Sequence, residues 1–182
     1  MNQERLNEIE KPLLHLVERD VVPALGCTEP ISLALAAATA AKYLGKTPER
    51  IEAKVSPNLM KNGLGVAVPG TGMVGLPIAA AIGALGGDPE GELEVLKHIT
   101  PEQVSQAKAM LDKKLVNVDI HQTEHILYSE AVLLADNDRV KVAIQDQHTN
   151  IILIEKNGEV VFEKEHDECA DCDPYDMFKQ VS

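Results

Sequence analysis

The sequence predicts an α+β fold, in which buried helices rich in alanine and glycine pack beside a small antiparallel β-sheet unit with its own helix. Two apolar runs with helical character, 29–44 and 73–85, lie in the first half, and alternation with period two begins near residue 116. The 182 residues are 45% hydrophobic but only 3% aromatic. The core is therefore expected to be aliphatic, with closely packed helices.

The first half of the chain is predicted to be mainly helical. Residues 3–22 place apolar side chains at helical spacing, and Pro23 to Gly26 end that helix. Residues 29–44 form a second helix that Gly45 closes, and it is apolar on all sides, as expected of a buried helix. Residues 51–56 then alternate like a strand.

The segment 56–76 is predicted to be a glycine-rich loop. Its Pro69–Gly72 stretch precedes the apolar run of 73–85, so it resembles a loop that leads into a helix N-terminus, where carboxylates and phosphates bind. A surface position is the plain interpretation of the lysine, but a lysine and an asparagine are costly to bury in an apolar loop, so a ligand-facing role is the alternative. The substrate-binding candidates are Lys61, Asn62, Gly70, Thr71 and Gly72.

The second half is predicted to be a helix followed by an antiparallel meander. The helix spans 100–114 and begins at the capping-box spacing of Thr100 and Gln103. Strands are expected at 116–120, 126–135, 139–145, 150–155 and 159–163. The chain is accordingly divided into a helical region (residues 1–98), an α+β meander unit (residues 99–165) and an acidic tail (residues 166–182).

Charge and cysteine content restrict the classes of partner. The formal net charge of -12 argues against nucleic acid and anionic membranes. There is neither a long apolar stretch nor a signal-peptide pattern, so the expected compartment is the cytoplasm. The pair Cys169 and Cys172 has CxxC spacing but lacks a second pair, so we interpret it as incidental and predict no metal site in this chain.

Cys27 is the candidate for chemistry. It lies at the mouth of the helix 29–44, with Thr28 as the expected N-cap and Pro30 in the first turn. Unpaired backbone N–H groups and the helix dipole favour a thiolate, so the thiol pKa should fall below about 8.5. A thiolate is a base, a nucleophile or a metal ligand. The competing interpretation is a buried structural cysteine, and the apolar helix would place Cys27 at an interior cleft.

Three segments together resemble one family. They are Pro-Ala-Leu-Gly-Cys-Thr-Glu-Pro at 23–30, the glycine-rich stretch at 55–81, and His-Thr-Asn-Ile at 148–151. The chain resembles the N-terminal portion of the L-cysteine desulfidases, iron–sulfur lyases related to the α chain of bacterial L-serine dehydratases. The resemblance implies conversion of L-cysteine to pyruvate, ammonia and sulfide, or an L-serine dehydratase-like reaction. It also implies that Cys27 is the proton acceptor.

The same resemblance implies a [4Fe–4S] cluster held by three cysteines of a later region, so the cluster ligands are expected outside this chain. The chain is then a portion of such a lyase, or a subunit whose partner supplies the other half. A small amino acid is the expected substrate, and a homo-oligomer or the missing C-terminal half is the expected partner. The alternative is a non-catalytic remnant that binds a small molecule or a protein. The residues do not distinguish cysteine from serine as substrate.

Overall fold

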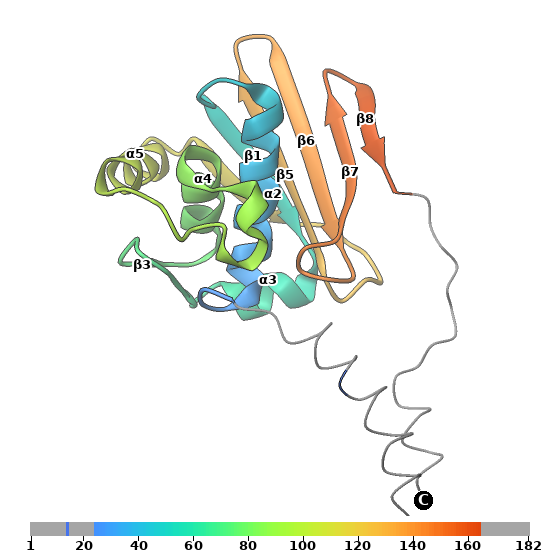
Figure 1. Cartoon of the computed structure of the whole chain (residues 1–182), viewed down its shortest axis with the longest axis horizontal. Coiled ribbons are helices and arrows are strands. Elements are labelled where there is room, and N and C mark those ends of the chain that lie inside the picture. Colours follow the sequence, from blue (N-terminus) through green and yellow to red (C-terminus); the bar gives the residue numbers. More distant parts are fainter. Residues whose placement is uncertain (1–13, 15–23, 165–182) are drawn as a thin grey trace, which may run out of the picture.

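The structure is a computed structural model that describes residue 14 and residues 24–164. It contains a six-stranded sheet in the order β4-β1-β5-β6-β7-β8, together with a two-stranded hairpin, β2-β3 (Figure 1). Helices and the sheet form separate layers, so the predicted α+β class is confirmed. Within the described residues of the chain, no helix has the length and apolar character needed to cross a membrane.

The elements follow one another with short connections. The helices are α2 (Thr28–Leu44), α3 (Pro57–Gly63), α4 (Leu76–Gly86), the 3-10 helix η1 (Pro89–Glu94) and α5 (Pro101–Asp112). The first strands are β1 (Arg50–Val55), β2 (Ala67–Val68), β3 (Met73–Val74) and β4 (Val116–Ile120). The remaining strands are β5 (Tyr128–Ala135), β6 (Asp138–Gln145), β7 (Ile151–Lys156) and β8 (Glu159–Glu163).

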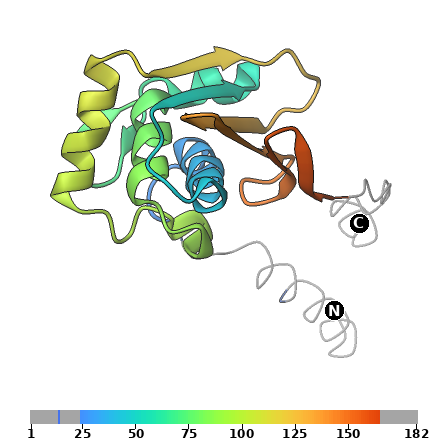
Figure 2. The same ribbon diagram turned by 90° about the horizontal axis from the view of Figure 1, so that it is seen from above.

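Helix α2 is the centre of the molecule. It contacts α4 on one side and strands β5 and β6 on another, and η1 also packs on it (Figure 2). Its alanines and leucines are nearly all buried, as the apolar composition predicts. Gly45 ends the helix with φ 72°, and its N–H donates to the carbonyl of Ala41 at 3.0 Å. The predicted helix and its glycine stop are both confirmed.

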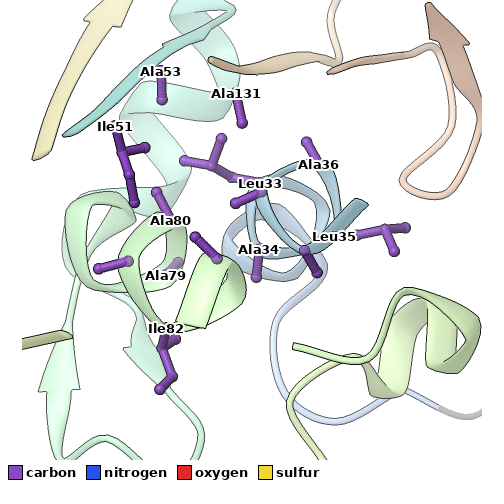
Figure 3. Packing of buried hydrophobic residues seen from close by; sticks show 14 of the residues in the cluster. Leu33, Ala34, Leu35, Ala36, Ile51, Ala53, Ala79, Ala80, Ile82 and Ala131 are labelled. Carbon is purple, nitrogen blue, oxygen red and sulfur yellow. The ribbon is translucent and has the colours of Figure 1, made fainter. Parts of the chain in front are cut away.

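Helices α2 and α4 approach each other closely because small residues face each other. A Cβ atom on Gly83 would lie 2.3 Å from the carbonyl oxygen of Ala34, which is too close for any side chain. Figure 3 shows Ala34 and Leu33 of α2 beside Ala79 and Ala80 of α4, with strand residues completing the cluster. The expected aliphatic, closely packed core is therefore present.

The sheet is mixed. Strands β5 to β8 pair antiparallel in sequence order, as predicted for a meander. The prediction is wrong for β4, which pairs parallel with β1, with Ile51 opposite Val116. Strand β1 also pairs antiparallel with β5. The sheet thus combines a strand from the predicted helical region with strands from the predicted meander unit, and the division between these two regions stays a prediction.

Three elements were not expected from the sequence: helix α3 and the short strands β2 and β3, the last of which occupies residues predicted to begin the helix 73–85. The predicted loop 56–76 contains helix α3, which begins because the Ser56 hydroxyl accepts a hydrogen bond from the Leu59 N–H at 3.2 Å, and Pro57 occupies the first turn. Helices α2, α4 and α5 and strands β1 and β4 to β8 lie close to the predicted ranges. The predicted helix 3–22 and the acidic tail 166–182 lie outside the described residues, apart from position 14.

Candidate functional site

Cys27 lies at the start of α2, on the surface. Its backbone is extended (φ -76°, ψ 136°) and it occupies the N-cap position, so the prediction that Thr28 is the N-cap is wrong by one residue. Cys27 is exposed, which also contradicts both the interior cleft and the buried structural cysteine. As far as the described residues extend, the sulfur is therefore open to small molecules.

The thiol of Cys27 is hydrogen-bonded to a carboxylate. Its Sγ donates to Oε2 of Glu29 at 2.7 Å. This hydrogen bond, with a smaller contribution from burial, raises the pKa of the Cys27 thiol above its ordinary value. The predicted lowering of that pKa is wrong, because the negative charge two residues along outweighs the backbone N–H groups of the helix start. At neutral pH Cys27 is a thiol with its proton directed at Glu29.

Glu29 connects three elements. Its carboxylate accepts the thiol hydrogen bond, which lowers the pKa of Glu29, and a hydrogen bond from the Asn62 side chain in α3 acts in the same direction. The hydroxyl of Thr28 is 3.5 Å from the same Oε2 atom. His148, in the turn between β6 and β7, interacts electrostatically with Glu29. The carboxylate thus lies at the centre of a cluster formed by Cys27, Glu29, Asn62 and His148.

His148 is half-buried. Burial lowers the pKa of its imidazole below 6.5, and the nearby Glu29 carboxylate offsets part of this shift. The imidazole is therefore neutral at neutral pH. The two residues after it serve the turn, since the Asn150 side chain donates to the carbonyl of Gln145 at 2.9 Å.

The glycine-rich hairpin lies against the turn that precedes Cys27. Gly26 has φ 94°, a conformation that favours glycine, and a Cβ atom there would lie 2.7 Å from Cγ of Pro69. Glycine at position 26 therefore permits both the turn before Cys27 and the approach of Pro69. The described part of the first segment (residues 24–30) and the segments 55–81 and 148–151 are far apart in sequence, and the structure brings them to one place.

The structure distributes the predicted substrate-binding residues unevenly. Asn62 joins the cluster through Glu29, and Lys61 precedes it as an exposed residue in the last turn of α3. Gly70, Thr71 and Gly72 form the turn between β2 and β3, so they do not lead directly into α4, which begins at Leu76. The hydroxyl of Thr71 is buried and donates to the Val68 carbonyl at 2.8 Å.

Sequence reasoning missed two members of the cluster. The sequence pointed to Glu29 and His148 only as members of the segments 23–30 and 148–151 that carry the family resemblance, and neither was among the candidate site residues. The spacing of Glu29, two residues after Cys27 and within the same first turn, was the available signal for a side-chain contact. For His148 no local signal exists, because the fold alone brings the β6–β7 turn to the start of α2.

The described residues do not fit an iron–sulfur cluster. A [4Fe–4S] cluster with three cysteine ligands needs three thiolates at one place. Within residues 24–164, Cys27 is the one cysteine, and no group of three His, Cys, Asp or Glu side chains is placed to hold a metal ion. Cys169 and Cys172 lie outside the described residues. The described residues therefore supply no ligand set for an iron–sulfur cluster.

The cluster of Cys27, Glu29, Asn62 and His148 is arranged for proton chemistry. It places one acidic proton, on the Cys27 sulfur, between an exposed surface and a carboxylate. The thiol and the imidazole are neutral at neutral pH, so Glu29 carries the charge of the four side chains. Such a group accepts or releases a proton when a ligand changes the charge beside it.

Comparison with known proteins gives homologues over most of the chain. A UPF0597 protein of Actinobacillus pleuropneumoniae serotype 3 (strain JL03) is 65% identical over 158 residues, which is 87% of this chain and 37% of that protein. A UPF0597 protein of Yersinia enterocolitica is 55% identical over 172 residues, or 93% of this chain and 39% of the relative. A third, from Dichelobacter nodosus, is 49% identical over 177 residues. No family model matches the chain.

The matches cover most of this chain but only a minor part of each relative. The matches span 87–97% of this chain but only 37–41% of the three curated relatives. Over most of its length the chain is therefore homologous to the UPF0597 proteins, and it corresponds to a little over a third of their length.

Proposed function

We propose that this chain is the portion of a β-eliminating lyase that carries the proton acceptor for L-cysteine, or for L-serine in a dehydratase-like reaction. The observation that supports this most directly is the meeting of three distant segments around an exposed cysteine. These are the segments through which the chain resembles the L-cysteine desulfidases. A packing role explains neither the exposure of Cys27 nor its contact with Glu29.

In the proposed reaction, the Cys27 thiolate removes the proton from the α-carbon of the amino acid. The electron pair of that C–H bond forms the double bond between the α and β carbons, and the β-substituent leaves as hydrosulfide, or from serine as hydroxide, which takes up a proton from solvent to give water. The aminoacrylate becomes an imine, and water hydrolyses it to pyruvate and ammonia. The described residues supply the base, and general-base catalysis of this kind contributes about 10²–10⁴-fold.

The remainder of the lyase is assigned to sequence beyond this chain. A cluster held by three cysteines finds no ligands in residues 24–164, so we place those ligands in the portion of the longer relatives that this chain does not span. The proposal includes a cytoplasmic location and association with that remaining portion, or with further copies of the chain. The leaving group of the substrate would face that remaining portion, so its residues would determine the choice between cysteine and serine.

A chimera tests the proposal. Residues 1–182 replace the matching portion of the Actinobacillus pleuropneumoniae relative, and pyruvate and sulfide are measured under anaerobic conditions after iron–sulfur reconstitution. Cys27→Ala is expected to lower kcat by at least ~100-fold, as for loss of a general base. Ser105→Ala, at an exposed position of α5, is the matched control and should leave kcat unchanged. A Cys27→Ala chimera with full activity would exclude the base.

Ligand binding separates the lyase from a non-catalytic remnant. A ligand that binds only the folded state raises its stability. If the chimera turns over neither amino acid while L-cysteine or L-serine still raises the melting temperature of the chain, the binding-module alternative is the correct one.

A further inference from the structure

We infer that Glu29 binds the α-ammonium group of the substrate, and that it keeps the Cys27 thiol protonated until that group binds. The inference rests on the proposed function, because it assigns a partner to the amino group of the same substrate. It makes Glu29 a substrate-binding residue and also the residue that controls when the base becomes available.

The Glu29 carboxylate lies directly beside the exposed thiol. Oε2 of Glu29 lies 2.7 Å from the Cys27 sulfur and 3.5 Å from the Thr28 hydroxyl, and the nearby Asn62 side chain favours the charged form of this carboxylate by lowering its pKa. These contacts fix the carboxylate beside an exposed sulfur. A ligand that reaches Cys27 therefore meets Glu29 at the same time.

The site carries a negative charge that complements an ammonium group. Of the groups that act on Cys27 and Glu29 from the elements around them, the thiol is protonated, Asn62 is neutral, and His148 is unprotonated at neutral pH. The Glu29 carboxylate is the remaining charge, and no cation pairs with it among these groups. An amino acid brings an ammonium group with three donors, which complements a partly buried carboxylate.

The substrate itself links the amino group to the proton that is removed. The amino nitrogen and the hydrogen to be removed are attached to the same α-carbon. An ammonium group held by Glu29 therefore brings that C–H bond next to the sulfur, because the sulfur and the carboxylate oxygen are themselves in contact. The arrangement selects α-amino acids over acids that carry a hydroxyl group in place of the amine.

The binding of the ammonium group has a consequence for the thiol. The ammonium donates to the oxygen that now accepts the thiol hydrogen bond, and its positive charge favours the thiolate. The thiol proton leaves to water at the exposed mouth of the site, and the sulfur is then free to take the α-proton. The base is thus formed only in the presence of substrate.

Alkylation of Cys27 in the full 182-residue chain measures this directly. The rate of reaction with iodoacetamide is followed against pH and quantified on the Cys27 peptide by mass spectrometry, so that Cys169 and Cys172 do not interfere. Glu29→Gln is expected to lower the pH midpoint by about 1–3 units, the range for loss of a neighbouring charge. The matched control is Glu102→Gln, at the same second position of α5, and it should leave the midpoint unchanged.

Binding of the ammonium group by Glu29 is tested with ligands that have no leaving group on the β-carbon. L-Alanine should raise the alkylation rate of the unmodified chain at neutral pH by roughly tenfold, as for a shift of one pKa unit, and L-lactate should not. In Glu29→Gln the rate should not respond to L-alanine. A midpoint that does not move in Glu29→Gln, or an equal response to alanine and lactate, overturns the inference.

A second variant covers the case in which Glu29→Gln does not fold, as judged by circular dichroism. Glu29→Asp keeps the charge but shortens the side chain, so its midpoint should fall between those of the unmodified chain and the amide variant; an unchanged midpoint contradicts the inference. Failure of the proposed function is seen separately, as an active Cys27→Ala chimera. The alkylation profile needs no turnover, so the two failures are distinguishable.

Discussion

The hydroxyl groups of Ser32 and Ser129 meet at 2.9 Å in the interior between α2 and β5, and neither residue is exposed. Ser32 lies one turn beyond Glu29, so this pair lies behind the candidate site. Ser129→Ala should lower the free energy of unfolding by about 1–3 kcal/mol, because it leaves a buried hydroxyl without a partner. Urea denaturation measures this loss.

The double variant Ser32→Ala with Ser129→Ala is the informative comparison for that pair. Since both polar groups are then removed, it should be less destabilised than the sum of the two single variants. Strict additivity of the three unfolding free energies would show that the two hydroxyls do not stabilise each other.

Because Gly83 packs directly against Ala34, position 83 should not tolerate even the methyl group of alanine. In Gly83→Ala the added carbon would lie 2.3 Å from the Ala34 carbonyl oxygen, so α2 and α4 must separate. The expected loss of stability is about 1–3 kcal/mol, and it exceeds the gain in helix propensity of about 1 kcal/mol. Gly65→Ala, with no atom within 4 Å of the new carbon, is the control that should be tolerated.

The capping box at the start of α5 gives a third test. The Thr100 hydroxyl accepts from the Gln103 N–H at 3.3 Å, and the Gln103 side chain accepts from the Thr100 N–H at 2.8 Å. Thr100→Ala should reduce stability by about 1 kcal/mol in thermal or urea unfolding. Thr100→Ser keeps the hydroxyl and should lose much less, whereas equal losses would contradict a capping role.

His148 predicts a pH dependence of stability. Burial lowers its pKa below 6.5 in the folded chain, so the folded state binds fewer protons than the unfolded state as the pH falls through this value. The unfolding free energy should therefore be highest above pH 6.5 and should decrease below it. His148→Gln should flatten this decrease in urea titrations at several pH values, and an unchanged slope would exclude His148 as its source.

Local signals made most elements predictable. The apolar run of α2 with its glycine stop, the capping box of α5, and the Asn157-Gly158 turn between β7 and β8 each involve neighbours in sequence. Helix α3 was also within reach, because Ser56 and Pro57 form an ordinary helix start. It was missed because the surrounding glycines favoured a loop.

Non-local pairing was not predictable in the same way. Nothing in the alternation of residues 116–120 says that this strand pairs parallel with β1, because strand alternation is the same in both orientations. The predicted protonation state of Cys27 was wrong for a related reason. The helix start was visible in the sequence, but the direction of the Glu29 carboxylate, and therefore the sign of the pKa shift, depends on side-chain placement.

The position of β1 between β4 and β5 also bears on the order in which the molecule forms during synthesis. Strand β1 leaves the ribosome before either of its neighbours exists, and its pairing with both is complete only after residue 135 has been made. His148 follows later still. All residues from Glu29 to His148 must therefore be synthesised before the environment of the Cys27 thiol is complete, so the thiol is formed early but its final surroundings are formed late.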